Sequence, residues 1–211
     1  MRGTTGICAG LALLAAAPAG ATDQDTQTWV TGTVAGSPAK DWNASLDVSQ
    51  RFRDPGDQQL VRGIVEYRLS SHLSIGGGAT YVWADNAPNE VRPHQQLTVT
   101  FGQLAVRSVL EERLFDGADR AEIRLRERAR VTEALGRSTR ASEAVELLYI
   151  LQPQNRLTKA RWDSWRGIVQ LQQKLSRHLD GSVGYQFVYA PRPTGADKIS
   201  HIPLLSLTWR P

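Results

Sequence analysis

The stretch AEIRLRERARV, residues 121–131, decides the fold of this chain. Every second residue from Glu122 to Arg130 is charged, and most of the residues between them are aliphatic or small. A period of two is that of a β-strand, whose successive side chains point to opposite faces. The segment therefore predicts a strand with one charged face and one apolar face.

The same alternation recurs in nine further segments between Trp42 and Trp209, and in a shorter one from Trp29 to Ala35. The runs are about nine to thirteen residues long, whereas an ordinary globular strand has about five or six and a tilted strand needs about nine to eleven to cross a bilayer. Several apolar faces carry aromatic residues of the kind that form girdles at membrane interfaces: Trp42, Tyr67, Trp83, Tyr149, Trp165, Tyr189 and Trp209. We therefore predict an all-β fold, a closed antiparallel up-and-down transmembrane β-barrel of about 10 to 12 strands.

The connections between the segments alternate in length, as they do in outer-membrane barrels. Compact connections lie at residues 36–41, 70–71, around 102, 135–140 and 175–180, and longer polar ones at 53–59, 85–90, 152–162 and 190–200. The strand count is harder to predict, because eleven segments are found and bacterial barrels normally have an even number. We expect ten strands, with residues 29–35 as a partial or inserted strand, or twelve.

The alternation does not say which face meets water. A soluble lipocalin-like barrel or a β-sandwich would place the same apolar faces inward and the charges in water. This ligand-carrier fold is the alternative to a membrane barrel.

Composition excludes other classes of protein. Beyond residue 21, polar residues interrupt every apolar run before the roughly 20 residues that a spanning helix needs, and a hydrophobic content of 41% in 211 residues argues against disorder. A formal net charge of +4, with 21 acidic residues, is too small to favour nucleic acid as a partner.

The first 21 residues have the pattern of a cleaved secretory signal. Arg2 precedes an apolar stretch from Ile7 to Ala17, and the small residues of Ala19–Ala21 follow it. We expect cleavage after Ala21, which leaves residues 22–211 as one barrel domain; a buried N-terminal helix is the alternative. Cys8, the only cysteine, lies inside this segment, too early for a lipoprotein anchor.

Several motifs, taken in order, resemble the domain of unknown function 2490 family, which consists of short outer-membrane β-barrel proteins of Gram-negative bacteria. The motifs are 25–29, 50–53, 67–69 with the glycine-rich strand that follows, 92–96, 110–113, 124–130 and 154–156. The resemblance implies an outer-membrane barrel and carries no activity, catalytic residue, cofactor or metal. The chain departs from such barrels at its end, Trp209-Arg210-Pro211, because they usually finish on an aromatic residue.

The charged faces of two neighbouring segments form the candidate site. If the chain turns at Asp116–Asp119, matching these faces places Arg113 opposite Glu122 and Glu111 opposite Arg124. The remaining arginines continue a positive stripe along the wall. The predicted lumen charge network comprises Arg107, Glu111, Arg113, Glu122, Arg124, Arg126, Arg128 and Arg130.

Two interpretations of this network concern its effect on the lumen. Arginines and glutamates can fill a narrow bore and hold the barrel together, which predicts a structural protein or a narrow pore. An excess of arginine can instead favour negative solutes, which predicts an anion-selective channel.

An outer-membrane lipid hydrolase is a third interpretation. It needs a nucleophile, a base and an orienting group within hydrogen-bond reach. His94 is the only histidine expected in the lumen near a long loop, and no serine or aspartate accompanies it at a suggestive spacing. The sequence also contains no metal-ligand spacing or nucleotide fingerprint, so we predict no enzyme, no cofactor and no metal.

Glu127 breaks the alternation, because it falls on the apolar face of its segment. We expect it to lie near a rim, to face a partner or to mark a β-bulge. Glu112 has the same parity but ends a strand. Outer-membrane lipid and, during insertion, the barrel-assembly machinery are the expected partners; the sequence does not predict an oligomeric state.

Overall fold

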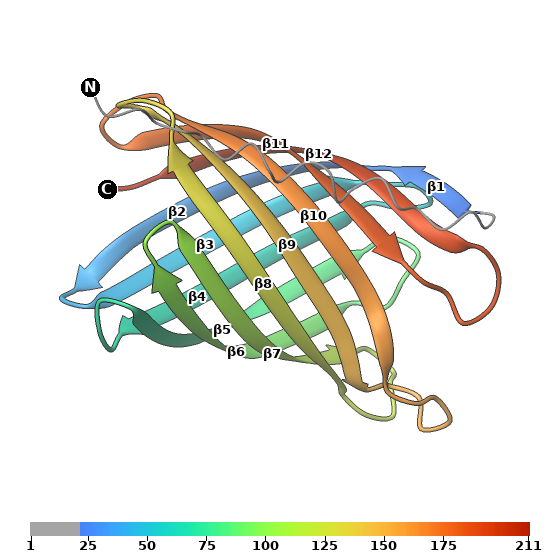
Figure 1. Ribbon diagram of the computed structural model, residues 1–211. Helices are drawn as coiled ribbons and strands as arrows, with labels where there is room; N and C mark the ends of the chain where they lie inside the picture. The colour runs from blue at the N-terminus through green and yellow to red at the C-terminus, as the bar shows by residue number, and fades with distance from the viewer. Residues whose placement is uncertain (1–21) are drawn as a thin grey trace.

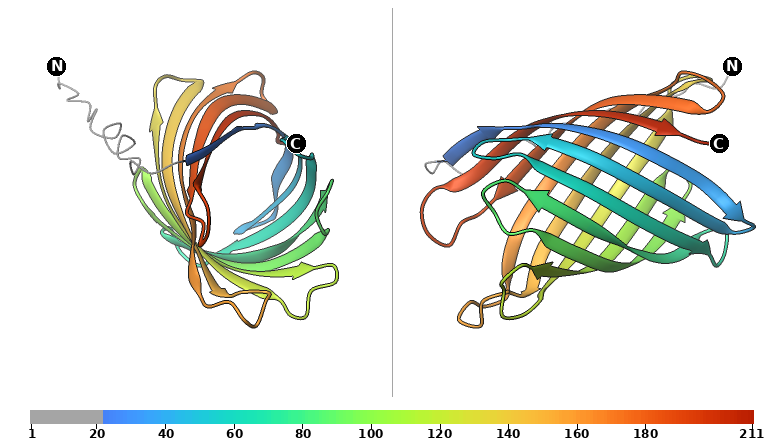
Figure 2. Two further views of the ribbon diagram at one scale, coloured as in Figure 1. Left: turned by 90° about the vertical axis from the view of Figure 1, so that its right-hand side faces the viewer. Right: turned by 180° about the vertical axis from the view of Figure 1, so that it is seen from behind.

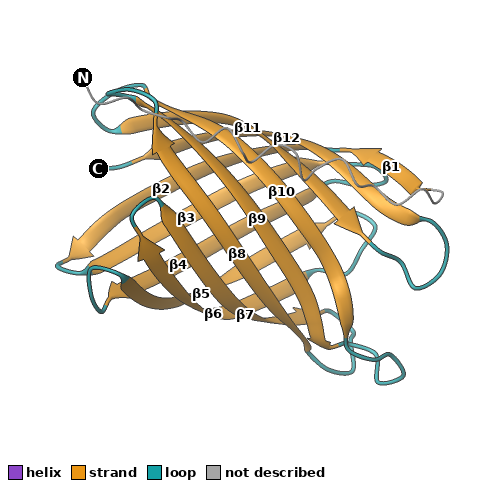
Figure 3. Ribbon diagram, in the orientation of Figure 1, coloured by secondary structure: helices purple, strands orange, loops and turns teal. Residues whose placement is uncertain are grey.

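The computed structural model describes residues 22–211, so the expected signal segment lies outside the described residues. These residues form twelve strands that belong to one sheet (Figures 1 and 3). They contain no helix of the length and apolar character that a membrane span requires. The strands are β1 (Thr22–Thr26), β2 (Thr28–Ala39), β3 (Trp42–Phe52), β4 (Gln58–Arg68), β5 (Leu73–Ala84), β6 (Glu90–Phe101), β7 (Leu104–Phe115), β8 (Glu122–Ala134), β9 (Thr139–Gln152), β10 (Arg161–Lys174), β11 (Leu179–Ala190) and β12 (Asp197–Trp209).

Eleven strands, β2 to β12, close the barrel, so neither ten nor twelve describes its wall. Each strand from β2 to β11 pairs antiparallel with the next, and the wall closes where β12 pairs in parallel with β2, with Leu204 opposite Trp29. β1 pairs with the earlier part of β12, with Thr22 opposite Asp197, and so continues the line of β2. The closure is parallel because β2 and β12 both run from the long loops to the compact turns (Figure 2).

The two ends of the barrel differ. The compact rim carries the short turns at 40–41, 69–72, 102–103, 135–138 and 175–178, and the long-loop rim carries the connections at 53–57, 85–89, 116–121, 153–160 and 191–196. The β6–β7 turn is tight because Gly102 adopts φ of 58°, which glycine reaches without a steric penalty. The chain ends at the compact rim, where the backbone N–H of Arg210 donates to the carbonyl of His178 at 2.7 Å.

Where the strand pairing is regular, side chains alternate between lumen and outer wall. In β3, Leu46 and Val48 expose 49% and 55% of their surface, whereas Asp47 between them exposes 8%. Arg124, Arg126 and Arg128 of β8 point inward like Asp47, and most of the large apolar residues of the other strands are exposed on the outer wall like Leu46. The alternative of a soluble ligand carrier, whose apolar faces would point inward, is therefore wrong. The exposed apolar outer wall is that of a transmembrane barrel.

Aromatic pairs lie near both ends of this wall. Near the compact rim the rings of Trp42 and Tyr67 are 5.0 Å apart, and near the long-loop rim those of Tyr81 and Trp83 are 4.4 Å apart. Their positions match the girdles of membrane barrels at the two interfaces.

The glycines of β5 are a close-packing point in the wall. A Cβ atom at Gly78 would lie 2.0 Å from the carbonyl oxygen of Gly63 in β4, and one at Gly76 would lie 2.5 Å from that of Val65. Only glycine permits this approach between the two backbones.

Glu127 points to the outer wall in the middle of β8. The pairing of β7 and β8 is continuous at this position, with Ser108 opposite Glu127, and the irregularity in β8 lies between Ile123 and Arg124 instead. The rim and bulge explanations for Glu127 are therefore wrong. The hydroxyl of Ser108 donates to its carboxylate at 2.7 Å, which offsets part of the cost of placing a charge at hydrocarbon depth.

We expect Glu127→Leu to raise the free energy of unfolding by about 1–2 kcal/mol, because a carboxylate facing hydrocarbon is unfavourable. Urea titration of the protein folded into lipid vesicles, followed by tryptophan fluorescence, measures the change. Leu125→Glu, two residues along the same face, is the matched control and should lower the same quantity. A loss of stability in Glu127→Leu would contradict the outward assignment.

Candidate functional site

The β7–β8 hairpin brings opposite charges together in the lumen. Glu111 lies opposite Arg124, and Arg113 lies opposite Glu122. Nε of Arg124 donates to Glu111 at 2.9 Å, and a terminal nitrogen of Arg113 donates to Glu122 at 2.7 Å. Charge-assisted bonds of this kind are the strong ones in a protein interior.

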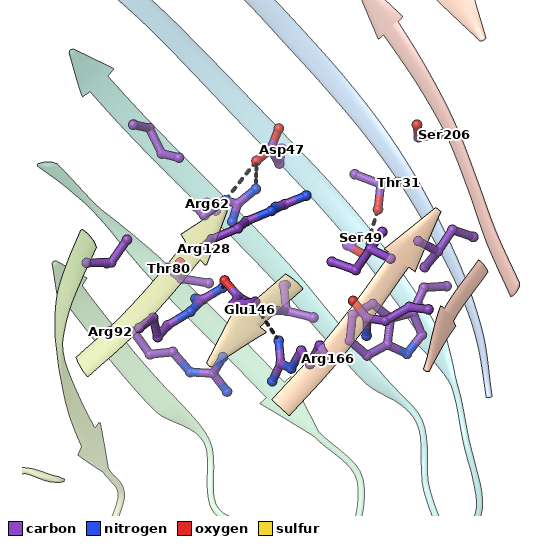
Figure 4. A pocket seen from close by; sticks show the side chains of 18 of the residues that line it. Thr31, Asp47, Ser49, Arg62, Thr80, Arg92, Arg128, Glu146, Arg166 and Ser206 are labelled. Carbon is purple, nitrogen blue, oxygen red and sulfur yellow. Dashed lines mark hydrogen bonds and ion pairs between the residues drawn. The ribbon is translucent and has the colours of Figure 1, made fainter. Parts of the chain in front are cut away.

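Glu146 of β9 is the centre of the network, and Figure 4 shows its contact with Arg166. Its side chain is almost completely buried and accepts a bond from Arg126 at 2.7 Å and one from Arg166 at 3.3 Å. A terminal nitrogen of Arg107 lies 3.9 Å from the same carboxylate. Arg126 also reaches Glu111 at 3.4 Å, so one arginine connects the β7–β8 hairpin to β9.

Other parts of the network lie outside the predicted set. Nε of Arg113 donates to Glu90 at 2.9 Å, and Glu90 also pairs with Arg92. On the far wall, Arg62 donates to Asp47 at 2.8 Å. The period of two in the sequence places most of these residues on the polar faces of their strands. It does not reveal which residues of the neighbouring strands they pair with.

A cavity of about 310 Å³ lies in the middle of the lumen. Eight arginines and three carboxylates line it, which leaves an excess of five positive charges (8 − 3 = 5). The arginines are Arg51, Arg62, Arg92, Arg107, Arg124, Arg126, Arg128 and Arg166, and the carboxylates are Asp47, Glu111 and Glu146.

Many of the guanidinium groups around the cavity have donors without an acceptor. Within residues 22–211, the buried Nε atoms that lack a hydrogen-bond partner belong to Arg51, Arg92, Arg107, Arg126, Arg128 and Arg166. An unsatisfied buried donor costs about 1–3 kcal/mol, and more where it is charged. Several guanidinium donors in the lumen therefore lack an acceptor atom, and water or an anion can provide one.

Arg51 and Arg128 are the least satisfied of these residues. The guanidinium of Arg51 lies 3.8 Å from the centre of the Trp29 ring and donates to Gln58 at 2.9 Å. Arg128 lies opposite Glu146 in the ladder, but that carboxylate is directed to Arg126 and Arg166. In the part of the chain that the structure describes, neither Arg51 nor Arg128 forms an ion pair.

Arg130, the last member of the predicted stripe, is exposed and makes no ion pair with any described residue. It lies opposite Ala105 and Ala144, nearer the compact rim than the cavity. The structure therefore brings seven of the eight predicted residues into the network or onto the cavity and leaves Arg130 on the approach to it.

The lumen is filled towards the long-loop rim. Val82, Leu148, Ile150 and Ile202 share the lumen face there, and each exposes 2% of its surface or less. Towards the compact rim, lumen-facing residues such as Ser206 stay partly exposed. The cavity is thus more open on the side of the compact turns. Consecutive apolar residues in β9, from Leu147 to Leu151, are the signal in the sequence for this filled part.

His94 is buried on the lumen face of β6, opposite Glu111. The Glu111 carboxylate is already held by Arg124 and Arg126, so it does not form the orienting partner of a catalytic histidine. Residues 22–211 also bring together no group of three histidine, cysteine or acidic side chains that could hold a metal ion.

We expect Glu146→Gln to lower the free energy of unfolding by about 3 kcal/mol, because it leaves Arg126 and Arg166 buried without a counter-charge. Urea titration in lipid vesicles measures this. Asp119→Asn, an exposed position in the loop at 116–121, is the control and should change stability by less than about 0.5 kcal/mol. Equal effects of the two variants would contradict a central role for Glu146.

Two solved structures resemble this fold. The structure described as "NanC porin structure in rhombohedral crystal form" superposes with a TM-score of 0.54 and 13% identity, over 78% of this chain and 87% of that chain. A structure described as "KdgM porin" superposes with a TM-score of 0.52 and 15% identity, over 74% of this chain and 81% of that chain. At this identity the likeness shows the fold.

A search of curated proteins finds no match to the chain. The family model described as "Protein of unknown function (DUF2490)" matches residues 26–199, which contain strands β2 to β11 in full. The match agrees with the motifs noted in the sequence, and the chain belongs to this family.

Proposed function

We propose that the protein is a narrow anion-selective channel of the outer membrane, exported by a signal segment that is removed after Ala21. The observation that carries the proposal is the excess of five positive charges in the lining of the central cavity, where six of the eight arginines have an unpartnered buried Nε. That both structural neighbours are described as porins supports a channel in the same fold.

The electrostatics of the lumen favour anions. A confined passage with an excess of positive charge lowers the energy of a negative solute and raises that of a cation. The carboxylates do not cancel this effect, because each of the three that line the cavity is already paired with arginine. Several arginines share one carboxylate, and Arg51 and Arg128 have none within 4.0 Å, so a net positive field remains.

The arginines of β8 form a series of steps along the lumen. Arg124, Arg126, Arg128 and Arg130 occupy alternate positions, so their Cα atoms are about 7 Å apart. Conduction requires several sites of moderate strength from which an ion can pass to the next. The stripe supplies such sites from the cavity to the compact rim.

A purely structural barrel is the second candidate. The near-complete burial of Val82, Leu148 and Ile202 favours it, because these side chains fill the bore towards the long-loop rim. In this case the arginine–glutamate network would hold the wall together without passing solute. An outer-membrane hydrolase is supported less, because the residue opposite His94 is engaged by arginines.

We expect purified protein in planar lipid bilayers to give small current steps that select chloride over potassium. Arg128→Gln should reduce the ratio of anion to cation permeability about fivefold, since one charge near a hydrated path contributes about 1 kcal/mol. The reversal potential in a potassium chloride gradient gives this ratio.

Arg156→Gln is the matched control, because it removes the same charge from an exposed long loop. It should leave the ratio unchanged. Bilayers that stay silent with correctly folded protein would favour the structural barrel, and cation-selective steps would overturn the proposal.

A further inference from the structure

We infer that the central cavity is a binding site for a tetrahedral, multiply charged oxyanion of the phosphate class. The inference rests on the proposed function in one respect, namely that anions enter the lumen. It goes further because it names the ligand and the residues that hold it.

The unpartnered donors reach the cavity from different parts of the wall. Arg51 and Arg92 come from β3 and β6, whereas Arg128 and Arg166 come from β8 and β10. Figure 4 shows Arg92, Arg128 and Arg166 around Glu146, each from its own strand. A ligand in this space therefore meets donors on several sides.

The direction of these donors selects the shape of the ligand. A carboxylate offers two oxygens in one plane, so a small carboxylate ion reaches donors on opposite walls less well than a tetrahedral group does. A phosphate group presents oxygens tetrahedrally and can accept from opposite walls at once. Guanidinium groups match phosphate well, because their fixed fork donates two parallel hydrogen bonds.

The charge of the cavity selects the valence of the ligand. Glu90 pairs with Arg92, and Asp163 lies 3.5 Å from Arg124, so the excess of five falls to three (5 − 2 = 3). One monovalent anion compensates this excess poorly. A phosphate group carries about −1.5 to −2 at pH 7, so one phosphate or a linked pair of phosphates compensates much more of the excess. In the low dielectric of a lumen this difference is amplified.

The volume of the cavity permits a ligand of this kind. A water molecule takes about 30 Å³ of liquid volume, so 310 Å³ exceeds the needs of one phosphate and leaves room for a second group. Thr31, Ser49 and Trp29 line the same cavity, and the hydroxyls of Thr31 and Ser49 lie 3.0 Å apart. They provide hydroxyl groups and an aromatic edge for the remainder of a phosphate-bearing solute.

Arg51 and Arg128 are the residues on which binding should depend most. The other arginines with unpartnered Nε atoms already have a carboxylate within 4.0 Å, whereas these two do not. Their removal leaves the pairs at Glu111 and Glu146 intact, so the barrel wall keeps its internal bonds.

The test is isothermal titration of the folded full-length mature protein in detergent with sodium pyrophosphate, and with sodium acetate at matched ionic strength. We expect pyrophosphate to bind at least tenfold more tightly than acetate. Arg51→Gln and Arg128→Gln should each weaken pyrophosphate binding about tenfold, and Arg156→Gln should leave it unchanged. Heat-modifiable mobility on gels establishes that each variant has folded.

Arg128→Lys extends the test to a variant that keeps the charge and loses the planar fork. Weaker pyrophosphate binding in this variant supports recognition by the guanidinium geometry. Equal affinity for pyrophosphate and acetate, or binding that is insensitive to both Arg51→Gln and Arg128→Gln, would overturn the inference.

Bilayer recordings separate this inference from the proposed channel. Anion-selective steps without preferential pyrophosphate binding would retain the channel and remove the phosphate site. Preferential pyrophosphate binding in a protein that does not conduct would retain the site and remove the channel. Where both hold, pyrophosphate should reduce the chloride current at concentrations near its dissociation constant.

Discussion

The structure depends on the pairing of buried arginines with buried glutamates in the lumen of the barrel. Eleven strands with apolar outer faces leave their polar faces in a narrow interior, where an unpaired charge is expensive. Glu111 and Glu146 lower that cost by each accepting from two arginines at 3.4 Å or less. Because Arg126 reaches both carboxylates, it ties β7, β8 and β9 to one another through side chains as well as through the backbone.

Much of this arrangement follows from the sequence, because a period of two is local information. The alternation from Glu122 to Arg130 places its arginines on one face, and the match of opposite charges sets the register of Glu111 against Arg124. Strand length and the exposed aromatic residues then favour the membrane over a soluble barrel. Register within this hairpin is predictable because only one alignment of the two charged faces places both Glu111 and Arg113 opposite a residue of the other sign.

The rest depends on contacts between residues that are far apart in the chain. The parallel closure of β12 on β2 could not be predicted, since alternation is the same in parallel and antiparallel strands. The cavity could not be predicted either, because Arg51 and Arg166 line the same space only after the wall has closed. Glu146 is flanked by Val145 and Leu147 in the sequence, and nothing local indicates that three arginines of β7, β8 and β10 converge on it.

The imbalance of charge separates a structural role from a binding role for this lumen. A network that served only to hold the wall together would be most stable with equal numbers of opposite charges, because each unpaired arginine adds a desolvation cost and repels its neighbours. The filled part of the lumen near the long-loop rim approaches this condition, with apolar side chains and with two carboxylates, Glu90 and Glu122, bound to two arginines, Arg92 and Arg113. Even with Glu90 and Asp163 counted, the cavity departs from it by three charges (5 − 2 = 3) and is more open towards the compact rim. An excess that lowers the stability of the empty barrel is consistent with an interior that is completed by a negatively charged solute.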